Sequence, residues 1–313
     1  MSNWHKLNEQ AAGVFIISAT PFTEDGALDL DSTDRLVEFY IEKGVSGITI
    51  LGMMGEAPKL APDESLEFMQ HVVRRVNGRV QVVVGVSNAG LDNLVRLARD
   101  SMDAGVAGVM IAPAANLGTE QKIYNYFSQV FAALGDDVPV CYQDYPFATK
   151  SEISVATFNR LVADFTQLVM LKHEEWPGLN KLTEVRKASE EGLRRVSVLV
   201  GNGGLYLPQE LERGADGAMT GFAYPEMLVE VVELHRGGQP DKAEDLFDAY
   251  LPLVRHEQQP GFGLALRKEV LHRRGLLASP TVRLPGPRLN QADQDELTRL
   301  ITRVERNLDA LRS

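Results

Sequence analysis

The chain lacks most of the features that mark secreted and membrane proteins. It has one cysteine, Cys141, so it can form no internal disulfide, and this fits a reducing compartment. No uninterrupted apolar run approaches the roughly 20 residues that a membrane helix needs. The segment Met1–Lys6 lacks the basic-then-apolar pattern of a secretory signal. We therefore expect a cytoplasmic protein without a membrane segment.

Positive charge and metal-binding patterns are also scarce. Acidic residues outnumber Lys and Arg by 43 to 32, and the net charge of −11 argues against a nucleic-acid backbone as the main partner. The six histidines show no H-x-H or H-E-x-x-H spacing, so we expect no catalytic metal. No G-x-G-x-x-G follows the first predicted strand, which weakens a dinucleotide-binding interpretation. A small anionic metabolite remains a suitable ligand, because backbone N–H groups and one lysine can bind it locally.

What the sequence does contain is a regular alternation of apolar runs and amphipathic stretches. The apolar runs are continuous, as expected for strands buried on both faces. Helix patterns such as 33–43, 65–76 and 121–134 lie between them, preceded by acidic or hydroxyl residues that can cap a helix. The predicted strands are Val14–Ser18, Gly47–Leu51, Val80–Val86, Gly108–Ala112, Val138–Tyr142, Leu168–Leu171, Val196–Val200 and Gly217–Thr220.

The number and order of these units predict the fold class. Eight strand-then-helix units fill roughly residues 13–237, close to the typical size of a (β/α)8 barrel. A doubly wound open sheet is the alternative, but it usually has fewer strands. Beyond Gly237-Gly238 the strand signals stop, and residues 241–253, 261–274 and 291–311 have helical patterns. We predict an α/β protein with a TIM barrel over 1–237 and a helical appendage over 238–313 packed on it.

Lys172 is the first candidate catalytic residue. It follows the apolar run 168–171, which must be buried to justify its composition, while the ammonium must find a partner or a cavity. The C-terminal ends of barrel strands are where active sites are built. A desolvated lysine at such a position can form a Schiff base with a carbonyl substrate. The alternative is a strand-end lysine that reaches solvent or pairs with Glu174.

A glycine-bracketed turn follows the second strand directly. In Gly52-Met53-Met54-Gly55-Glu56, two glycines allow a tight turn whose N–H groups converge on one point. Such an arrangement suits a carboxylate or a phosphate. At the end of the second strand it would face the barrel mouth where Lys172 emerges. The alternative is an ordinary turn between a strand and a helix.

Three further strand ends carry polar or small residues. The fifth strand ends in Tyr142-Gln143-Asp144-Tyr145-Pro146, which offers hydrogen-bonding groups and an acid or base, or else a polar loop that Asp144 caps. The seventh leads into Gly201-Asn202-Gly203-Gly204, a run too rich in glycine for simple packing. The eighth ends in Thr220-Gly221-Phe222, where small residues leave room for a ligand.

Together these segments resemble the dihydrodipicolinate synthase and N-acetylneuraminate lyase family of class I pyruvate-type aldolases. The likeness covers nearly the whole chain, and its motifs are Thr20-Pro21-Phe22, Gly52-x-x-Gly55-Glu56, the segment before Pro146 and Lys172. The resemblance implies that Lys172 forms a Schiff base with a 2-keto acid. It implies that Met53 and Met54 direct backbone N–H groups to the carboxylate of that acid. It also implies a homotetramer and no cofactor.

The chain departs from dihydrodipicolinate synthase where that enzyme handles its second substrate. In that family two hydroxyl residues occupy the turn, and the first belongs to a proton relay with two tyrosines. An arginine after the strand-five proline holds the second carboxylate. The residues that stand at these places are Met53 and Met54, Ala114-Ala115, and Phe147-Ala148-Thr149.

The strand-five tyrosine of that relay has two candidate positions. Anchoring on Pro146 puts Gln143 there, and only a one-residue insertion restores Tyr142. A closer likeness is to the branch that dehydrates 2-keto-3-deoxy sugar acids. The matching motifs are Gln143-Asp144-x-Pro146, Lys172-x-Glu174 and Gly217-Ala218-Met219-Thr220-Gly221.

We therefore predict a lyase that dehydrates a 2-keto-3-deoxy sugar acid, or cleaves it to pyruvate. Tyr142 and Gln143 are the candidate acid/base residues beside Lys172. Glu174 is a predicted substrate contact that can also hold or orient the lysine. Condensation of pyruvate with an aldehyde, as in dihydrodipicolinate synthesis, is the first alternative. The second is a barrel that has lost catalysis and only binds a keto acid. The remaining predicted substrate contacts are Gly52, Met53, Met54, Gly55, Glu56, Asp144, Asn202, Thr220 and Gly221.

Overall fold

The structure is a computed structural model, and it describes residues 6–312. Residues 1–5, which form most of the segment expected to lack a secretory signal, lie outside the described residues, as does Ser313. Within residues 6–312, no helix is both long enough and apolar enough to cross a bilayer.

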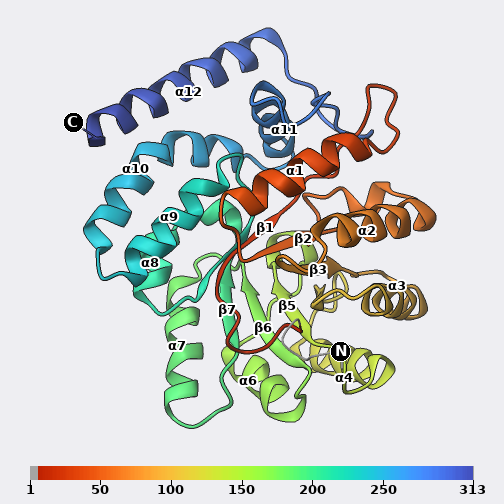
Figure 1. Cartoon of the computed structure of the whole chain (residues 1–313). Helices are drawn as coiled ribbons and strands as arrows, with labels where there is room; N and C mark the ends of the chain where they lie inside the picture. Colours follow the sequence, from red (N-terminus) through yellow and green to blue (C-terminus); the bar gives the residue numbers. More distant parts are fainter. Residues whose placement is uncertain (1–5, 313) are drawn as a thin grey trace.

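Eight parallel strands close into a barrel in chain order, which confirms the predicted fold (Figure 1). The barrel closes where β1 pairs with β8, and Phe15 lies opposite Met219 there. Two strands end two residues later than predicted, at Asp144 and His173. The strands are β1 (Gly13–Ile17), β2 (Gly47–Ile50), β3 (Gln81–Gly85), β4 (Gly108–Ile111), β5 (Val140–Asp144), β6 (Leu168–His173), β7 (Ser197–Val200) and β8 (Gly217–Thr220).

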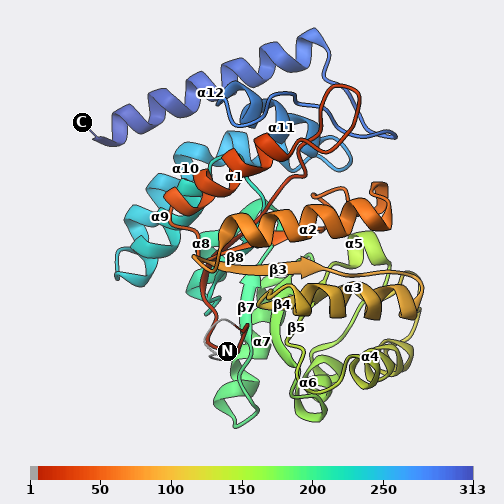
Figure 2. The same cartoon turned by 45° about the vertical axis from the view of Figure 1, so that its right-hand side comes forward.

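Helices surround the barrel in both ribbon views (Figures 1 and 2). Side chains cap several of them: the Asp29 carboxylate accepts from the Ser32 N–H, and the Thr119 hydroxyl accepts from the Lys122 N–H. These helices are α1 (Leu30–Glu42), α2 (Pro62–Val76), α3 (Leu91–Asp103), α4 (Glu120–Leu134), α5 (Pro146–Thr149), α6 (Val155–Asp164), α7 (Leu179–Glu190), α8 (Leu207–Glu212) and α9 (Pro225–Arg236). Two 3-10 turns, η2 (Ala57–Lys59) and η3 (Asn202–Gly204), follow β2 and β7.

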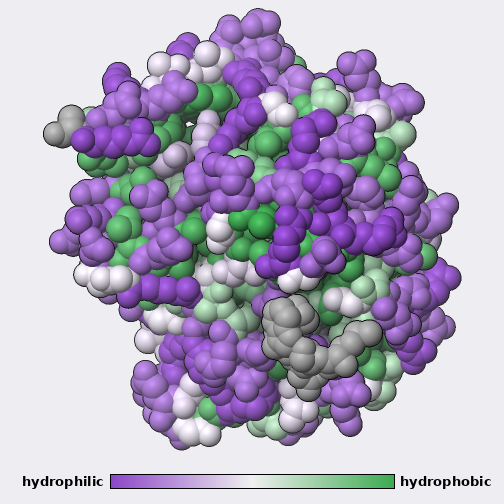
Figure 3. All heavy atoms as spheres, viewed as in Figure 1, coloured by the Kyte–Doolittle hydropathy of each residue, from purple (hydrophilic) through white to green (hydrophobic). Residues whose placement is uncertain are grey.

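Three helices follow the last barrel unit: α10 (Pro240–Glu257), α11 (Gly263–Arg273) and α12 (Gln291–Arg312). α10 packs against α9, and α12 lies along α10 at the edge of the molecule (Figure 1). The segment that follows α11 is tied to α1, because the Ala278 N–H donates to the Ser32 hydroxyl at 2.9 Å. Hydrophilic residues dominate the face seen in Figure 1, with hydrophobic residues in small separate groups (Figure 3).

The strands bury side chains on both faces, and the two faces belong to different cores. One core combines strand residues with helix residues, so it fills the layer between the barrel and its helices. The other contains no helix residue and therefore fills the barrel interior. Cys141 lies in this interior, where burial raises the pKa of its thiol to about 12, so the thiol stays protonated at neutral pH. The interior strand residues include Phe15, Ile17, Val83, Met110, Cys141, Met170, Leu199 and Met219.

Candidate active site

Lys172 and Gln143 lie side by side at the C-terminal ends of β6 and β5. They are paired in the strand register, two residues after the paired interior residues Met170 and Cys141. Because side chains alternate along a strand, Lys172 and Gln143 also face the barrel axis. Both are buried, with Lys172 5% exposed. The structure therefore brings these two predicted catalytic residues together at the mouth of the barrel.

Glu174 completes this group, and one of its oxygens contacts both neighbours. Its Oε2 lies 3.2 Å from the Lys172 Nζ and accepts a 2.8 Å hydrogen bond from the Gln143 Nε2. The Glu174 side chain is 9% exposed, so water screens the interaction little. A carboxylate at this distance can accept a proton from the lysine or return one to a bound substrate.

Backbone contacts from the neighbouring loops fix the position of Glu174. Its N–H donates to the Asp144 carbonyl at 3.0 Å, and its carbonyl accepts a 3.0 Å hydrogen bond from the Asn202 Nδ2. The predicted site residue Asn202 therefore positions Glu174. A Cβ on Gly201 would overlap the Glu174 side chain, so the loop after β7 can approach this closely only with glycine there.

The turn after β2 lies at the same end of the barrel, because all parallel strands of a barrel end at one face. The Gly55 N–H donates to the Gly52 carbonyl and the Glu56 N–H to the Met53 carbonyl, each at 3.0 Å. Within residues 6–312, the N–H groups of Met53 and Met54 donate to no other residue. The Met54 side chain packs against the interior core, while Met53 is 41% exposed. This turn can thus offer two backbone donors to an anion.

Tyr142 does not reach this group. It alternates with Cys141 and Gln143, so its side chain lies on the outer face of β5. Its ring packs against Phe127 at a centroid distance of 4.7 Å and against Phe158 at 5.8 Å. Burial raises the pKa of its phenol well above the ordinary value. This corrects the expectation that Tyr142 is an acid/base residue, and Gln143 stands at the site in its place.

Asp144 also faces outward, which corrects its assignment as a substrate contact. Its Oδ2 lies 2.7 Å from the Lys181 Nζ of α7 and 3.7 Å from the His173 Nδ1. Lys181 also pairs with Glu175 and donates to the Ile153 carbonyl. These charges lie behind the ends of β5 and β6 and hold the two strands to α7, away from the barrel axis.

Three other predicted substrate contacts serve the framework. The Glu56 carboxylate turns away from the mouth and contacts Lys268 of α11. The Thr220 hydroxyl accepts a 2.7 Å hydrogen bond from the Gly203 N–H, which fixes the loop after β7. A Cβ on Gly221 would overlap the Arg267 guanidinium, so the backbone can lie this close to Arg267 only with glycine there. These contacts give all three a place in the framework, and their direct contact with a substrate stays a prediction.

The sequence indicated Tyr145 only as part of the polar end of strand five and gave it no place among the predicted site residues. Burial raises the pKa of its phenol, and the negative charge of Glu174 raises it further. Its only signal in the sequence was its position between Asp144 and Pro146. Within residues 6–312 there is no cluster of three His, Cys, Asp or Glu residues that could hold a metal ion.

Comparison with known proteins identifies the family. Residues 10–304 match the model of the dihydrodipicolinate synthetase family. L-2-Keto-3-deoxyarabonate dehydratase of Azospirillum brasilense is 29% identical over 94% of both chains. A 4-hydroxy-tetrahydrodipicolinate synthase of Methanococcus maripaludis is 29% identical over 78% of this chain and 82% of its own.

A solved structure is more similar still. The crystal structure of a dihydrodipicolinate synthase from Rhodopseudomonas palustris is 50% identical, with a TM-score of 0.93, over 95% of this chain and 99% of its own. The family acts on small molecules, and its members are class I aldolases and lyases. This chain is therefore an enzyme that belongs to the dihydrodipicolinate synthetase family.

Proposed function

We propose that the enzyme forms a Schiff base between Lys172 and a 2-keto acid, and dehydrates or cleaves a 2-keto-3-deoxy sugar acid. The observation that carries this proposal is the group at the mouth. A buried lysine lies 3.2 Å from a carboxylate oxygen that an amide also contacts. Lysine amines form imines with carbonyl substrates, and a neighbouring base activates them.

Imine formation uses Lys172 and Glu174 together. Glu174 accepts a proton from the ammonium, and the neutral amine attacks the keto carbon. The protonated carboxyl then returns its proton to the oxygen of the adduct. It takes a second proton from the nitrogen and delivers it to the same oxygen, which leaves as water. The product is a cationic iminium, whose charge makes the C3 protons acidic.

The turn after β2 supplies the contact for the carboxylate of the keto acid. The free N–H groups of Met53 and Met54 are suitable donors, because an anion can take two converging backbone hydrogen bonds. The hydroxyl of Thr20 donates to the Gly55 carbonyl at 2.6 Å and steadies the turn. Recognition of the carboxylate here depends on backbone shape, since both methionine side chains are apolar.

The next step divides dehydration from cleavage. In dehydration, Glu174 takes a C3 proton to give an enamine, which expels the C4 hydroxyl as it receives a proton. In cleavage, the base takes the proton of the C4 hydroxyl, the C3–C4 bond breaks, and the pyruvate enamine is protonated at C3. Gln143 donates to Glu174 and is the group placed to orient the C4 hydroxyl.

Dehydration is favoured by the residues of strand five. Gln143 takes the place at the mouth where a relay tyrosine would be needed for condensation. The likeness to the Azospirillum dehydratase over 94% of both chains supports the same choice. A panel of 2-keto-3-deoxy acids, assayed for dehydration and for pyruvate release, tests the proposal. Turnover of at least one acid supports it, and imine formation without any turnover contradicts it.

Condensation of pyruvate with an aldehyde is the second candidate. It is supported by the 50% identity to the Rhodopseudomonas palustris protein, whose structure carries the name dihydrodipicolinate synthase. It is opposed by Met53, by Ala114-Ala115 and by the residues after Pro146, which offer neither relay hydroxyls nor an arginine. A barrel that only binds keto acids is the third candidate, and its test is the absence of a covalent adduct after borohydride reduction with pyruvate.

We further propose a cytoplasmic homo-oligomer in which residues 238–313 form the appendage of a barrel domain. The resemblance to the family supports the oligomer, and the single buried cysteine fits a reducing compartment. Light scattering during gel filtration tests the oligomeric state, and a mass equal to that of one chain contradicts a homo-oligomer.

A further inference from the structure

A buried ionic network joins the turn after β2 to the C-terminal part of the chain, although more than 200 residues separate Glu56 from its partner on α11. Glu56 follows Gly55 directly, is 2% exposed, and has a left-handed backbone with φ of 56°. Leu51, at the other end of the turn, also has a positive φ of 54°. Such conformations persist in residues other than glycine only where the surroundings enforce them.

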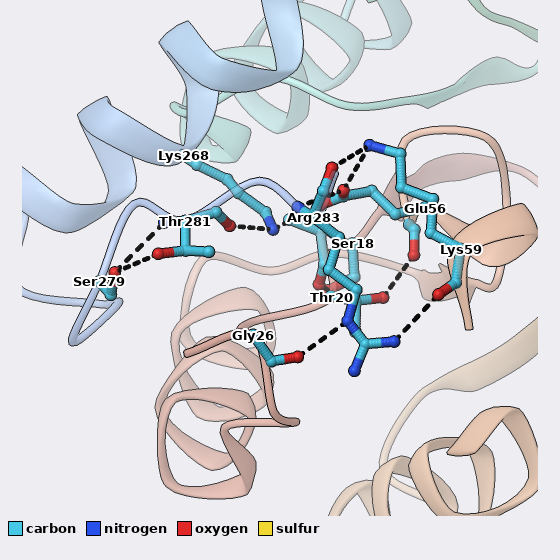
Figure 4. A network of polar contacts seen from close by, with 11 residues as sticks. Ser18, Thr20, Gly26, Glu56, Lys59, Lys268, Ser279, Thr281 and Arg283 are labelled. Carbon is cyan, nitrogen blue, oxygen red and sulfur yellow. Dashed lines mark hydrogen bonds and ion pairs between the residues drawn. The ribbon is translucent and has the colours of Figure 1, made fainter. Parts of the chain in front are cut away.

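Three donors surround the Glu56 carboxylate. The Lys268 Nζ of α11 lies 2.6 Å from Oε1, and the Lys59 Nζ of η2 lies 2.9 Å from Oε2. The Arg283 N–H, from the segment between α11 and α12, donates to Oε2 at 3.0 Å. Figure 4 shows the carboxylate between the chain around β2 and the C-terminal segment.

The C-terminal side of the network is itself held in place. Lys268 is fully buried, donates to the Thr281 carbonyl at 2.8 Å, and lies 4.4 Å from the centre of the Phe22 ring. The Arg283 guanidinium donates to the Gly26 carbonyl at 2.8 Å and to a Glu64 oxygen at 2.7 Å. The ammonium of Lys268 thus has a fixed position relative to the turn.

We propose that Glu56 is a positioning residue, and that Lys268 and Arg283 hold the turn through it so that the N–H groups of Met53 and Met54 meet the carboxylate of the keto acid. This inference rests on the proposed function, because it assigns the turn to that carboxylate. It gives the C-terminal part of the chain a role in substrate binding that acts through Glu56. Loss of the Lys268 charge should weaken substrate binding while the chemistry at Lys172 continues.

The pH dependence of binding should report on this contact. Burial lowers the pKa of Lys268 to about 8, although Glu56 raises it, and Lys59 and Arg283 lower it further. As the pH rises through about 8, Lys268 loses its proton and Glu56 loses its closest cation. Affinity for the keto acid should then fall.

Stability should respond to pH in the opposite direction. In the unfolded chain Lys268 keeps its proton up to its ordinary pKa of 10.5, so between pH 8 and 10.5 the unfolded state binds more protons. The Lys268 contribution to the free energy of unfolding therefore rises over the range in which affinity falls. If Lys268 served stability alone, affinity for the keto acid would not fall over the pH range in which the free energy of unfolding rises.

The test compares Lys268→Met with wild type and with Arg273→Met. Arg273 is a cation on the same helix, and it pairs with Glu269 at 2.7 Å away from the turn. Calorimetric titration with pyruvate measures affinity, and borohydride reduction at saturating pyruvate measures imine formation. We expect the dissociation constant to rise at least tenfold in Lys268→Met, with the trapped fraction at saturation unchanged. We expect Arg273→Met to bind as wild type does.

The alkaline weakening of binding should also disappear in Lys268→Met. Equal affinity of Lys268→Met and wild type at pH 7 would overturn the proposal. If Lys268→Met does not fold, the same titration with pyruvate is made on Glu56→Gln, which keeps the size of the side chain and removes its charge. Affinity equal to that of wild type would then overturn the proposal. Wild type that binds pyruvate but forms no adduct would contradict the Schiff-base proposal alone. Wild type that does not bind pyruvate would overturn both.

Discussion

Lys172 and Gln143, paired on neighbouring strands, converge on a single atom, Oε2 of Glu174. The ammonium lies 3.2 Å and the amide 2.8 Å from this oxygen. One carboxylate oxygen therefore meets the proposed nucleophile and a neutral donor that holds it in position. On this geometry we propose proton transfer by Glu174, beyond the substrate contact and the orienting role that the sequence indicated.

Replacing Glu174 by glutamine tests that assignment. The Glu174→Gln variant keeps the size of the side chain and cannot accept a proton, so kcat should fall by about 10²–10⁴-fold. Pyruvate should still bind, because the turn after β2 is unchanged. Steady-state kinetics with a turned-over keto-deoxy acid gives the result. The matched control is Glu175→Gln, since Glu175 pairs with Lys181 on the outer side. Equal activity of Glu174→Gln and the control would remove Glu174 from the mechanism.

Tyr142→Phe tests whether Tyr142, and not Gln143, acts at the strand-five position of the site. The Tyr142 hydroxyl is buried and has no hydrogen-bond partner among the described residues. An unsatisfied buried polar group costs about 1–3 kcal/mol, so its removal should leave Tm unchanged or raise it. We expect kcat within about twofold of wild type, because an outward-facing phenol takes no part in proton transfer. A hundredfold loss of activity in a stably folded variant would return Tyr142 to the site.

Gly55→Val and Met53→Leu, both in the turn after β2, should differ sharply in the apparent KM for the keto acid. A Cβ on Gly55 would lie 3.2 Å from the Leu51 nitrogen and 3.3 Å from the Gly52 carbonyl, so Gly55→Val must shift the backbone. The N–H groups of the turn move with this backbone, so the apparent KM of Gly55→Val should rise. Met53 is 41% exposed, and Met53→Leu should have little effect. The measurement is the apparent KM for the keto acid, and similar values for the two variants would exclude backbone recognition there.

The enzyme should be a poor dihydrodipicolinate synthase. Condensation requires a proton relay and a cation for the second carboxylate, and the chain has Met53, Ala114-Ala115 and 147–149 at those places. Loss of one donor that acts in a transition state costs about 2.7–4 kcal/mol, and such losses are not additive. The assay compares condensation of pyruvate and aspartate semialdehyde with dehydration of keto-deoxy acids by one preparation. Efficient condensation with no dehydration would make synthesis the function.

The barrel was predictable from the sequence because its signal is local and repeated. Each strand is an apolar run followed by a helix, and a side chain caps the N-terminus of α1, α4 and α6. The position of Lys172 near the end of a buried strand was predictable for the same reason, since a charge that follows an apolar run is easily recognised in the sequence. The division of the chain at residue 237 stays a prediction.

The direction of side chains at the strand ends was not predictable. Strands buried on both faces show no alternation of polar and apolar residues, so nothing local indicates that Gln143 faces inward and Tyr142 outward. A bulge between Val140 and Cys141 also shifts the pairing of β5 with β6. The contact between Glu56 and Lys268 joins residues more than 200 positions apart, so no local sequence pattern predicts it.

The most direct test of the proposed chemistry is borohydride reduction in the presence of pyruvate, followed by mass spectrometry of the intact protein. Wild type should gain the mass of one reduced pyruvate adduct per chain, located on Lys172 by peptide mapping. Lys172→Ala should fold normally, gain no mass and turn over no substrate. An adduct on another lysine, or a Lys172→Ala variant with near-normal activity, would contradict the Schiff-base account.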